Sequence, residues 1–342
     1  MNPPPFATNW ARELGAKEES LIQLNGGINN RVYRCGAGVE SYVIKGYEPA
    51  ESGKRDRMKS EVDFLGYAAI VAPHFVPKLH FSDWDRRCVV LEHLNGNNYA
   101  DGSAPTATDL EAAVTFFGLL NAKSELAPKL VEMDAAEGFL SLRGHLANIR
   151  DRINSMCVDH LPKVYQNAAQ ALLLRIKEAG EVIAKNTEAL ISSGVLYDGI
   201  DACERCVSPS DFGFHNAIRT TTGVKFFDFE FAGWDDPAKA AVDFVLQPRV
   251  PVRVMKSPLL MAMAQHGFEV NKHRLEALGL ILRLKWTAII LAILQPMRMT
   301  KLIANTNSTD VEQLTQERLT RAAHYLREES PFGLHRLPVA VA

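Results

Sequence analysis

Residues 208–217 read SPSDFGFHNA, a short polar segment directly before a run of alternating phenylalanines. Its Ser, Pro and Gly residues predict a loop, because these residue types favour turns over helix interiors. Asp211 and Asn216 lie five residues apart in this loop. An aspartate can act as a general base, and an asparagine oxygen is a neutral ligand that suits magnesium. Either residue alone also fits an ordinary turn, so the neighbouring sequence must discriminate between these interpretations.

The segment GVKFFDFEFAGW, residues 223–234, follows this loop and is predicted to be a strand. Carboxylates on one face of a strand are oxygen ligands, which suit magnesium better than a transition metal. An exposed acidic strand face is the simpler alternative for these carboxylates taken alone. The alternation of a strand would place Phe227, Phe229 and Phe231 on one face and Phe226, Asp228 and Glu230 on the other.

The first part of the chain has the pattern of an antiparallel sheet. Residues 20–46 contain short strand-like runs separated by Gly and Asn. An amphipathic helix is predicted within residues 53–71, where Met58, Val62, Leu65 and Ala69 recur at helical spacing. Two further strands are predicted at residues 78–83 and 87–94.

From about Asn95 onward the pattern becomes helical, with one β-like island at residues 205–231. We therefore predict an α+β fold of two lobes. The first, residues 1–94, is a β-rich lobe with one helix, and the second, residues 95–342, is larger and mostly helical. Long helices are predicted at residues 107–125, 161–193, 269–295 and 309–327.

The charge balance and the cysteine content of the chain indicate which classes of binding partner and which cellular compartment to expect. The 38 Lys and Arg residues nearly balance the 40 Asp and Glu residues, so the charge indicates neither a nucleic-acid nor a membrane partner. Five scattered cysteines do not form a disulfide pattern, and we expect a cytoplasmic protein. Cys203 and Cys206 have the spacing of half a zinc site, but no second pair follows. The apolar run at residues 286–297 is flanked by charges and is predicted to be a buried helix.

The order of Asp211, Asn216 and a later Asp-Phe-Glu resembles the aminoglycoside phosphotransferase and choline kinase family, small-molecule relatives of the protein kinases. The resemblance implies the two-lobed protein-kinase-like fold. It also implies ATP- and Mg²⁺-dependent phosphorylation of a hydroxyl on a small metabolite, such as a sugar, an amino alcohol or an aminoglycoside. By resemblance, Asp211 is the catalytic base, and Asn216 and Asp228 are the metal ligands. The role of Glu230 is left open.

The resemblance extends to the nucleotide-binding lobe. The segment LNGGINNRVYRC, residues 24–35, looks like the glycine-containing phosphate loop of the family. Glycines there let the backbone approach phosphate, and asparagine side chains offer donors. The residues concerned are Gly26, Gly27, Asn29 and Asn30.

Lys45 ends the strand-like run SYVIK and matches the lysine that holds the α- and β-phosphates in this fold. Its partner is expected to be Glu61 of the following helix, since the competing Asp63 faces a different way. The segment CVVLEHLNG resembles the hinge that binds adenine through its backbone, from Glu92 to Leu94.

Two departures from the family bear on function. Pro209 stands where the family usually has a histidine, two residues before the catalytic aspartate, so a non-catalytic nucleotide-binding module is the alternative. Gly213 stands where typical protein kinases have a lysine, and few residues separate Asp228 from Pro237, so an activation segment has little room. These two features argue against a protein kinase and for a small-molecule kinase.

The residues around the predicted site leave the acceptor and the oligomeric state open. Acidic and aromatic side chains there suit a cationic acceptor, or else form a solvated rim. Asp243 matches a structural aspartate of the family. The residues considered for the acceptor are Asp201, Glu204, Trp234, Asp235 and Asp236.

Overall fold

The computed structural model describes residues 3–24, 30–38, 40–50, 52–252, 271–306 and 310–327. The chain divides into two compact units. The first comprises Met1–Ala136 and Cys206–Asp235, and the second comprises Glu137–Arg205 and Asp236–Ala342. The lobe boundary predicted between residues 94 and 95 stays a prediction.

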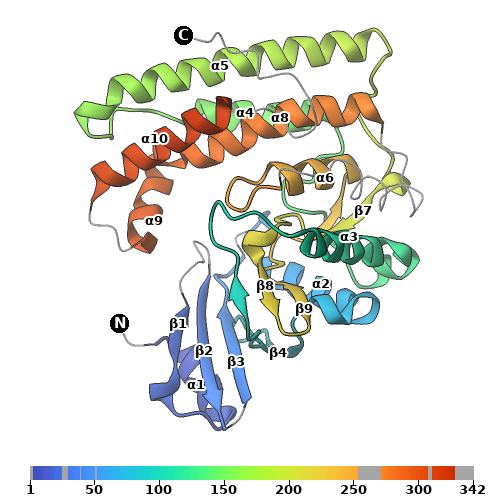
Figure 1. The fold of residues 1–342 in the computed structure, drawn as a ribbon, viewed down its shortest axis with the longest axis vertical. Coiled ribbons are helices and arrows are strands. Elements are labelled where there is room, and N and C mark those ends of the chain that lie inside the picture. The colour runs from blue at the N-terminus through green and yellow to red at the C-terminus, as the bar shows by residue number, and fades with distance from the viewer. Residues whose placement is uncertain are drawn as a thin grey trace. The chain divides into compact units, whose positions relative to one another are not determined.

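A five-stranded antiparallel sheet forms the N-terminal part of the first unit (Figure 1). Its strand order is β1-β2-β3-β5-β4, so β3 is central and pairs with both β2 and β5. The predicted strands are therefore present in an antiparallel arrangement. Their bounds are Ile22–Leu24 (β1), Arg31–Ala37 (β2), Glu40–Gly46 (β3), Leu79–Asp83 (β4) and Cys88–Glu92 (β5).

Two helices accompany this sheet. Helix α1, Pro5–Glu13, is not predicted from the sequence, and its Ala11 packs with Cys35, Ile44 and Val90 in a small apolar core. Helix α2, Arg57–Val71, is the predicted amphipathic helix, and it begins where the Asp56 side chain accepts a hydrogen bond from the Lys59 N–H.

The rest of the first unit carries the segment quoted at the outset. Helix α3, Ala107–Ala122, begins with a capping box between Thr106 and Asp109. A three-stranded sheet has the order β6-β8-β9, and β7 pairs with β10. The strand bounds are Asn97–Asn98 (β6), Cys206–Ser208 (β7), Ala217–Thr220 (β8), Gly223–Phe226 (β9) and Gly233–Asp235 (β10).

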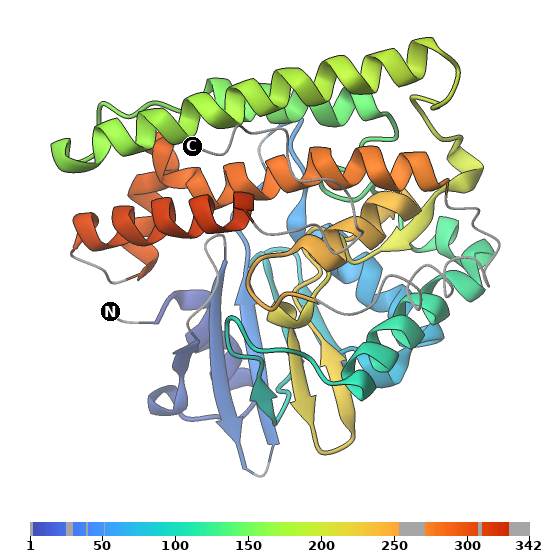
Figure 2. The same ribbon diagram turned by 45° about the horizontal axis from the view of Figure 1, so that its top comes forward.

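The second unit is helical, as predicted. Helices α5, α8 and α10 run alongside one another in both ribbon views (Figures 1 and 2). All ten residues of α6 are buried, so this helix lies in the core of the unit. Helices α4, α6 and α9 are not predicted from the sequence. The helix bounds are Leu142–Asn154 (α4), Lys163–Ser192 (α5), Pro237–Leu246 (α6), Lys272–Ile290 (α8), Pro296–Thr306 (α9) and Val311–Arg327 (α10).

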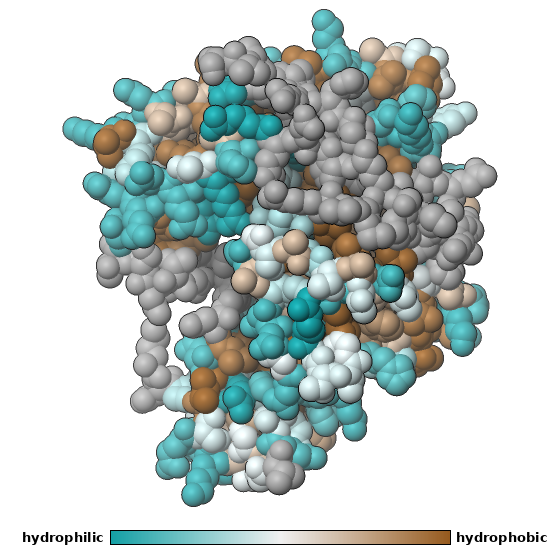
Figure 3. Space-filling model, viewed as in Figure 1, coloured by the Kyte–Doolittle hydropathy of each residue, from teal (hydrophilic) through white to brown (hydrophobic). Residues whose placement is uncertain are grey.

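The apolar run near residue 290 lies in a buried helix. Lys272–Leu294 is long and apolar enough to cross a membrane, but 83% of its most apolar window is buried inside the protein. Core helices of globular units share this property, so the helix is weak evidence for a membrane span. On the face seen in Figure 3, polar and apolar side chains are interspersed over the N-terminal sheet.

Candidate active site

Lys45 lies near the end of the central strand β3 and is almost completely buried. Its ammonium group contacts Glu61 Oε2 of α2 at 2.5 Å and also pairs with Asp228 Oδ1. Burial alone would lower the pKa of Lys45, but the negative charges of Asp228 and Glu61 outweigh it, and the pKa is raised. Lys45 is therefore a permanent cation held between a helix and the segment that follows β9.

Tyr47 is a further member of this ion network that the sequence does not indicate. Its hydroxyl donates to Glu61 Oε2 at 2.5 Å, and its ring centroid lies 5.3 Å from the Lys45 ammonium. Burial, and then the charge of Glu61, raises the pKa of Tyr47, so the hydroxyl remains a donor. The available signal is its spacing two residues from Lys45, which places both side chains on one face of an extended chain. The competing carboxylate Asp63 pairs with Lys59 at 2.9 Å.

Strand β7 leads into the loop at residues 208–217, and α3 holds this strand in place. The Asn121 side chain of α3 donates to the Val207 carbonyl at 3.1 Å and accepts from the Val207 N–H at 2.8 Å. Ser210 has φ of 64°, a left-handed conformation that reverses the chain just before Asp211. The loop therefore turns sharply at its catalytic candidate.

Buried aromatic rings anchor the loop after Asp211. The Phe212 ring lies 5.1 Å from the ring of Phe226, and the Phe214 ring lies 6.0 Å from it. Phe212 also packs against Phe116 of α3. Because both phenylalanines are almost fully buried, the backbone between them is fixed by packing on each side of Gly213.

The Asp211 carboxylate receives hydrogen bonds from two residues of its own loop. His215 Nε2 lies 3.1 Å from Asp211 Oδ1, and Asn216 Nδ2 lies 3.3 Å from Asp211 Oδ2. Asn216 also donates to the Asp211 backbone carbonyl at 3.0 Å. The Asp211 side chain is 33% exposed, so solvent and a substrate can reach it. His215 is not predicted as a site residue; its only signal in the sequence is its position beside Asn216.

The hairpin of β8 and β9 brings Asn216 next to the segment that contains Asp228. Ala217 pairs with Phe226, and the N–H of Phe227 donates to the Asn216 carbonyl at 3.0 Å. Asp228 has φ of 68°, a left-handed conformation that aspartate tolerates better than most residues. Backbone conformations of this kind are concentrated at functional sites. The two predicted metal ligands thus come from adjacent chain segments.

The strand alternation predicted for residues 226–231 is wrong. Strand β9 ends at Phe226, and residues 227–229 have no regular secondary structure. Phe226 and Phe229 are predicted on opposite faces, yet both are buried and both rings pack against Phe116, at 5.1 and 6.4 Å. The left-handed turn at Asp228 changes the direction of the chain, so the period of two does not continue.

Glu230 is buried beside the same ion network, and its charge acts on Lys45. Burial, and then the charge of Asp228, raises the pKa of Glu230. Asn30 donates its amide to Glu230 Oε2. Within the part of the chain that the structure describes, the buried Oδ1 of Asn30 has no hydrogen-bond partner. The other predicted residues of the glycine loop, Gly26, Gly27 and Asn29, lie outside the described residues.

The predicted hinge follows β5. The N–H of Glu92 donates to the Lys78 carbonyl at 2.8 Å, and the Glu92 carboxylate accepts from Lys225 at 2.9 Å. Glu92 is therefore tied to Lys78, just before β4, and to Lys225 of β9, links that the sequence does not indicate. Leu94 is buried two residues beyond β5. That Glu92 and Leu94 contact adenine stays a prediction.

The acidic residues considered for the acceptor do not form one solvated rim. Asp235 is fully buried, and Asp236 caps α6 while pairing with Arg274 at 2.6 Å. Asp201 and Glu204 are exposed and cap a short 3₁₀ turn, Ala202–Glu204. Asp236 is therefore structural.

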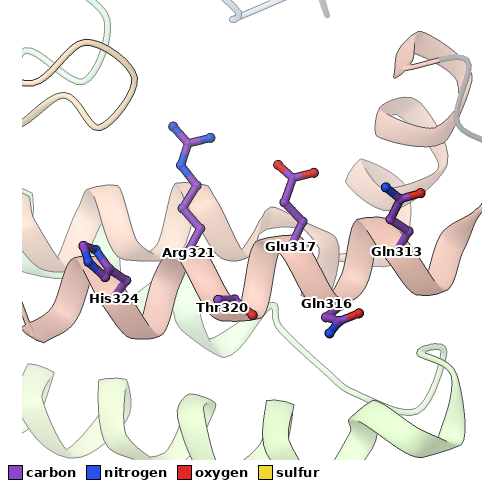
Figure 4. A pocket seen from close by; sticks show the side chains of 6 residues that line it. All are labelled: Gln313, Gln316, Glu317, Thr320, Arg321 and His324. Carbon is purple, nitrogen blue, oxygen red and sulfur yellow. The ribbon is translucent and has the colours of Figure 1, made fainter. Parts of the chain in front are cut away.

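A separate pocket of about 530 Å³ lies on α10 (Figure 4). It contains none of the predicted site residues, so we do not assign the chemistry to it. The pocket is lined by Gln313, Gln316, Glu317, Thr320, Arg321 and His324.

Among the described residues, no group of three or more His, Cys, Asp and Glu side chains is arranged to hold a metal ion.

A model of the phosphotransferase enzyme family (APH) matches residues 20–278. Because this match covers most of the chain, the protein belongs to that family. No curated protein matches the chain significantly. The family membership confirms the resemblance seen in the motifs.

Solved structures of small-molecule kinases resemble the chain over nearly its whole length. The choline kinase LicA from Streptococcus pneumoniae has a TM-score of 0.51 at 13% identity, covering 93% of this chain and 96% of that one. The spectinomycin phosphotransferase APH(9)-Ia, solved with ADP and spectinomycin, has a TM-score of 0.58 at 12% identity, covering 92% and 90%. The amicoumacin kinase hAmiN, solved with AMP-PNP and Ca²⁺, has a TM-score of 0.56 at 12% identity, covering 94% of each chain.

At such low identities these similarities show the fold, which is the predicted protein-kinase-like α+β fold. Together with the family match, they place the protein in the class of small-molecule kinases.

Proposed function

We propose that the protein transfers the γ-phosphoryl group of ATP, with Mg²⁺, to a hydroxyl of a small metabolite such as a sugar, an amino alcohol or an aminoglycoside-like acceptor. The observation that carries this proposal is the double contact of Lys45 with Glu61 and Asp228. It joins the nucleotide-binding strand β3 to the segment after β9. The β8–β9 hairpin then connects that segment to Asn216 and Asp211.

The residues at this site fit a magnesium ion. Asn216 and Asp228 offer oxygen ligands, and Mg²⁺ in phosphoryl-transfer sites typically uses one or two protein oxygens plus phosphates and water. Three carboxylates, Asp228, Glu61 and Glu230, surround the single ammonium of Lys45, so the site favours added positive charge. A bound Mg²⁺ would neutralise the phosphate oxygens during transfer.

The side chains have separate tasks in this proposal. Lys45 binds the α- and β-phosphates, and Glu61 with Tyr47 keeps its ammonium in place. Asp211 orients the acceptor hydroxyl and accepts its proton as the oxygen attacks the γ-phosphorus and the bond to ADP breaks. Phosphoryl transfer depends mainly on positioning and charge, so buried and tightly bonded supports for Lys45 and Asp211 match the chemistry.

The identity of the acceptor is open within the class of hydroxyl metabolites. The solved kinases that share this fold include choline, spectinomycin and amicoumacin kinases, which supports a small polar acceptor. The capping role of Asp236 removes it from the candidate acceptor contacts.

Transfer of labelled γ-phosphate to a panel of sugars, amino alcohols and aminoglycosides tests the proposal. We expect the wild-type protein to phosphorylate one class of the panel only when Mg²⁺ is present. Asp211→Ala should lower this rate by about 10²- to 10⁴-fold, the usual contribution of a general base, and should retain ATP binding measured by calorimetry. Asp151→Ala, at an exposed position of α4, is the control and should keep full activity.

If ATP binds and stabilises the protein but no acceptor is phosphorylated, the chain is the non-catalytic module considered above. If Asp211→Ala keeps the wild-type rate, Asp211 is not the base.

A further inference from the structure

We infer that His215 is the positioning residue for Asp211 and holds its carboxylate in one orientation. This inference rests on the proposed function for its catalytic consequence. The structural contact itself can be tested without any activity.

The contact between the two side chains is local and sheltered from water. His215 Nε2 lies 3.1 Å from Asp211 Oδ1, and the His215 side chain is only 7% exposed. A carboxylate accepts hydrogen bonds, so Nε2 carries the hydrogen and donates it. Nδ1 is buried and has no hydrogen-bond partner within the described part of the chain, so the imidazole makes its polar contact through Nε2.

The two donors hold the carboxylate from both ends. His215 binds Oδ1 and Asn216 binds Oδ2, so rotation of the carboxylate would break both hydrogen bonds. The 3₁₀ turn Phe214–Asn216 places these donors side by side, and the buried ring of Phe214 fixes the turn. Asp211 is thereby held in one orientation while a third of its side chain stays exposed to an acceptor.

Pro209 cannot take this positioning role. A proline at this position supplies no side-chain hydrogen bond and no N–H to the loop. The sequence offers donors on the other side of Asp211 instead. His215 lies four residues after it, in the 3₁₀ turn Phe214–Asn216, and its ring reaches back to Asp211.

Two variants separate hydrogen bonding from ring packing. His215→Phe keeps an aromatic ring and removes the donor, and we expect kcat to fall by about 10- to 100-fold, the cost of a misplaced reacting group. His215→Gln places an amide donor near the position of Nε2 and should recover most of this loss. The KM for ATP should stay unchanged in both variants, because neither alters Lys45 or Glu61.

His160→Phe is the matched control. His160 Nε2 also donates to an oxygen, the Ile293 carbonyl at 2.7 Å, but it does not touch Asp211. The melting temperature of His160→Phe should fall about as much as that of His215→Phe, but its kcat should stay at the wild-type value. In a protein that already carries Asp211→Asn, adding His215→Phe should not lower kcat further. The effects of two substitutions do not add when the residues act through the same contact.

The contact has a readout that does not need activity. Nitrogen-15 NMR of the His215 ring should show the proton on Nε2, and Asp211→Asn should shift that signal while leaving the His160 signal in place. A proton on Nδ1, or no response to Asp211→Asn, would overturn the inference even if the protein proves to be an active kinase. Equal kcat values for His215→Phe and the wild-type protein would overturn it as well. An absence of phosphate transfer by the wild-type protein would count against the proposed function, and the NMR result would then decide the contact alone.

Discussion

Lys45 in the first unit and Lys285 in the second are both buried and paired with carboxylates, but these carboxylates differ in their exposure to solvent. Lys45 contacts Glu61 and Asp228, and the Asp228 side chain is 34% exposed. Lys285 of α8 contacts Asp243 at 2.6 Å, and only 4% of the Asp243 side chain is exposed. Asp243 also forms an ion pair with Lys239 at 3.4 Å and accepts a hydrogen bond from the indole N–H of Trp286 at 3.0 Å.

The difference separates an ion network with a partly exposed carboxylate from one that is closed to solvent. Around Lys45, one carboxylate is partly exposed and negative charge exceeds positive charge, so the network favours an added cation. Around Asp243, burial would raise the pKa, but the charges of Lys285 and Lys239 outweigh it and the pKa is lowered. This network joins α6 to α8, which agrees with a structural aspartate.

The largest expected effect comes from Asp228→Asn, which removes charge from the open network. Phosphate transfer should fall by about 10³- to 10⁵-fold, the range for losing a charge that acts on the transferring phosphoryl group. Steady-state kinetics with the identified acceptor measures this loss. Asp63→Asn is the control, because Asp63 pairs with Lys59 rather than Lys45. A tenfold loss or less would mean that Asp228 does not bind the metal.

Next in size is Lys285→Met, which breaks the closed network. The free energy of unfolding should fall by about 3–5 kcal/mol, because Asp243 keeps a buried charge with one partner removed. Urea denaturation measures this change. Lys272→Met, on the same helix but 84% exposed, should change it by less than about 0.5 kcal/mol. Similar values for both variants would show that Asp243 is not held by Lys285.

The pH dependence of stability should also reflect the closed network. Burial, and then the charges of Lys239 and Lys285, lowers the pKa of His145 to about 3. The unfolded chain, with an ordinary histidine pKa near 6.5, then binds more protons between these two values, so stability falls as the pH decreases below about 6.5.

His145→Gln removes this titration. Between pH 6.5 and 4.5 the wild-type protein should lose about 2–3 kcal/mol more unfolding free energy than the variant does. Urea denaturation at each pH gives both curves. Parallel curves would show that His145 takes up its proton equally well in the folded protein.

The smallest effect is expected from Tyr47→Phe, which removes one donor from Glu61. Stability should fall by about 1–2 kcal/mol, and transfer only a few-fold, because Lys45 still binds Glu61. Thermal unfolding and kinetics measure the two effects. Tyr42→Phe is the control, since that hydroxyl bonds Glu40 at an exposed position. A hundredfold loss of transfer in Tyr47→Phe would place the hydroxyl in the chemistry itself.

The order of motifs along the chain was enough to predict the family and the fold class. Lys45, Glu61, Asp211, Asn216 and Asp228 all lie in the first compact unit, and the side-chain contacts link them in two groups. Periodicity predicted the long helices and the antiparallel strands well, because a regular element repeats its burial pattern over many residues.

Short helices and irregular loops were less predictable, because they offer few repeats. Nine residues of α1 and ten of α6 are too few for a clear period, and α6 is buried all round. The strand predicted through Asp228 failed because one left-handed residue redirects the chain, and no periodic pattern signals such a residue.

By itself, then, the sequence determined the family, the fold class and the order of the charged and amide side chains that we propose for phosphoryl transfer. Only the tertiary structure decided which of these side chains are fixed by hydrogen bonds or ion pairs, and which residues supply those contacts. The support of Asp211 by His215, of Glu61 by Tyr47, and of Asp243 by Lys285 depends on burial and on side-chain direction. Those properties arise when distant segments pack together, because a buried polar group must find a partner wherever the fold provides one.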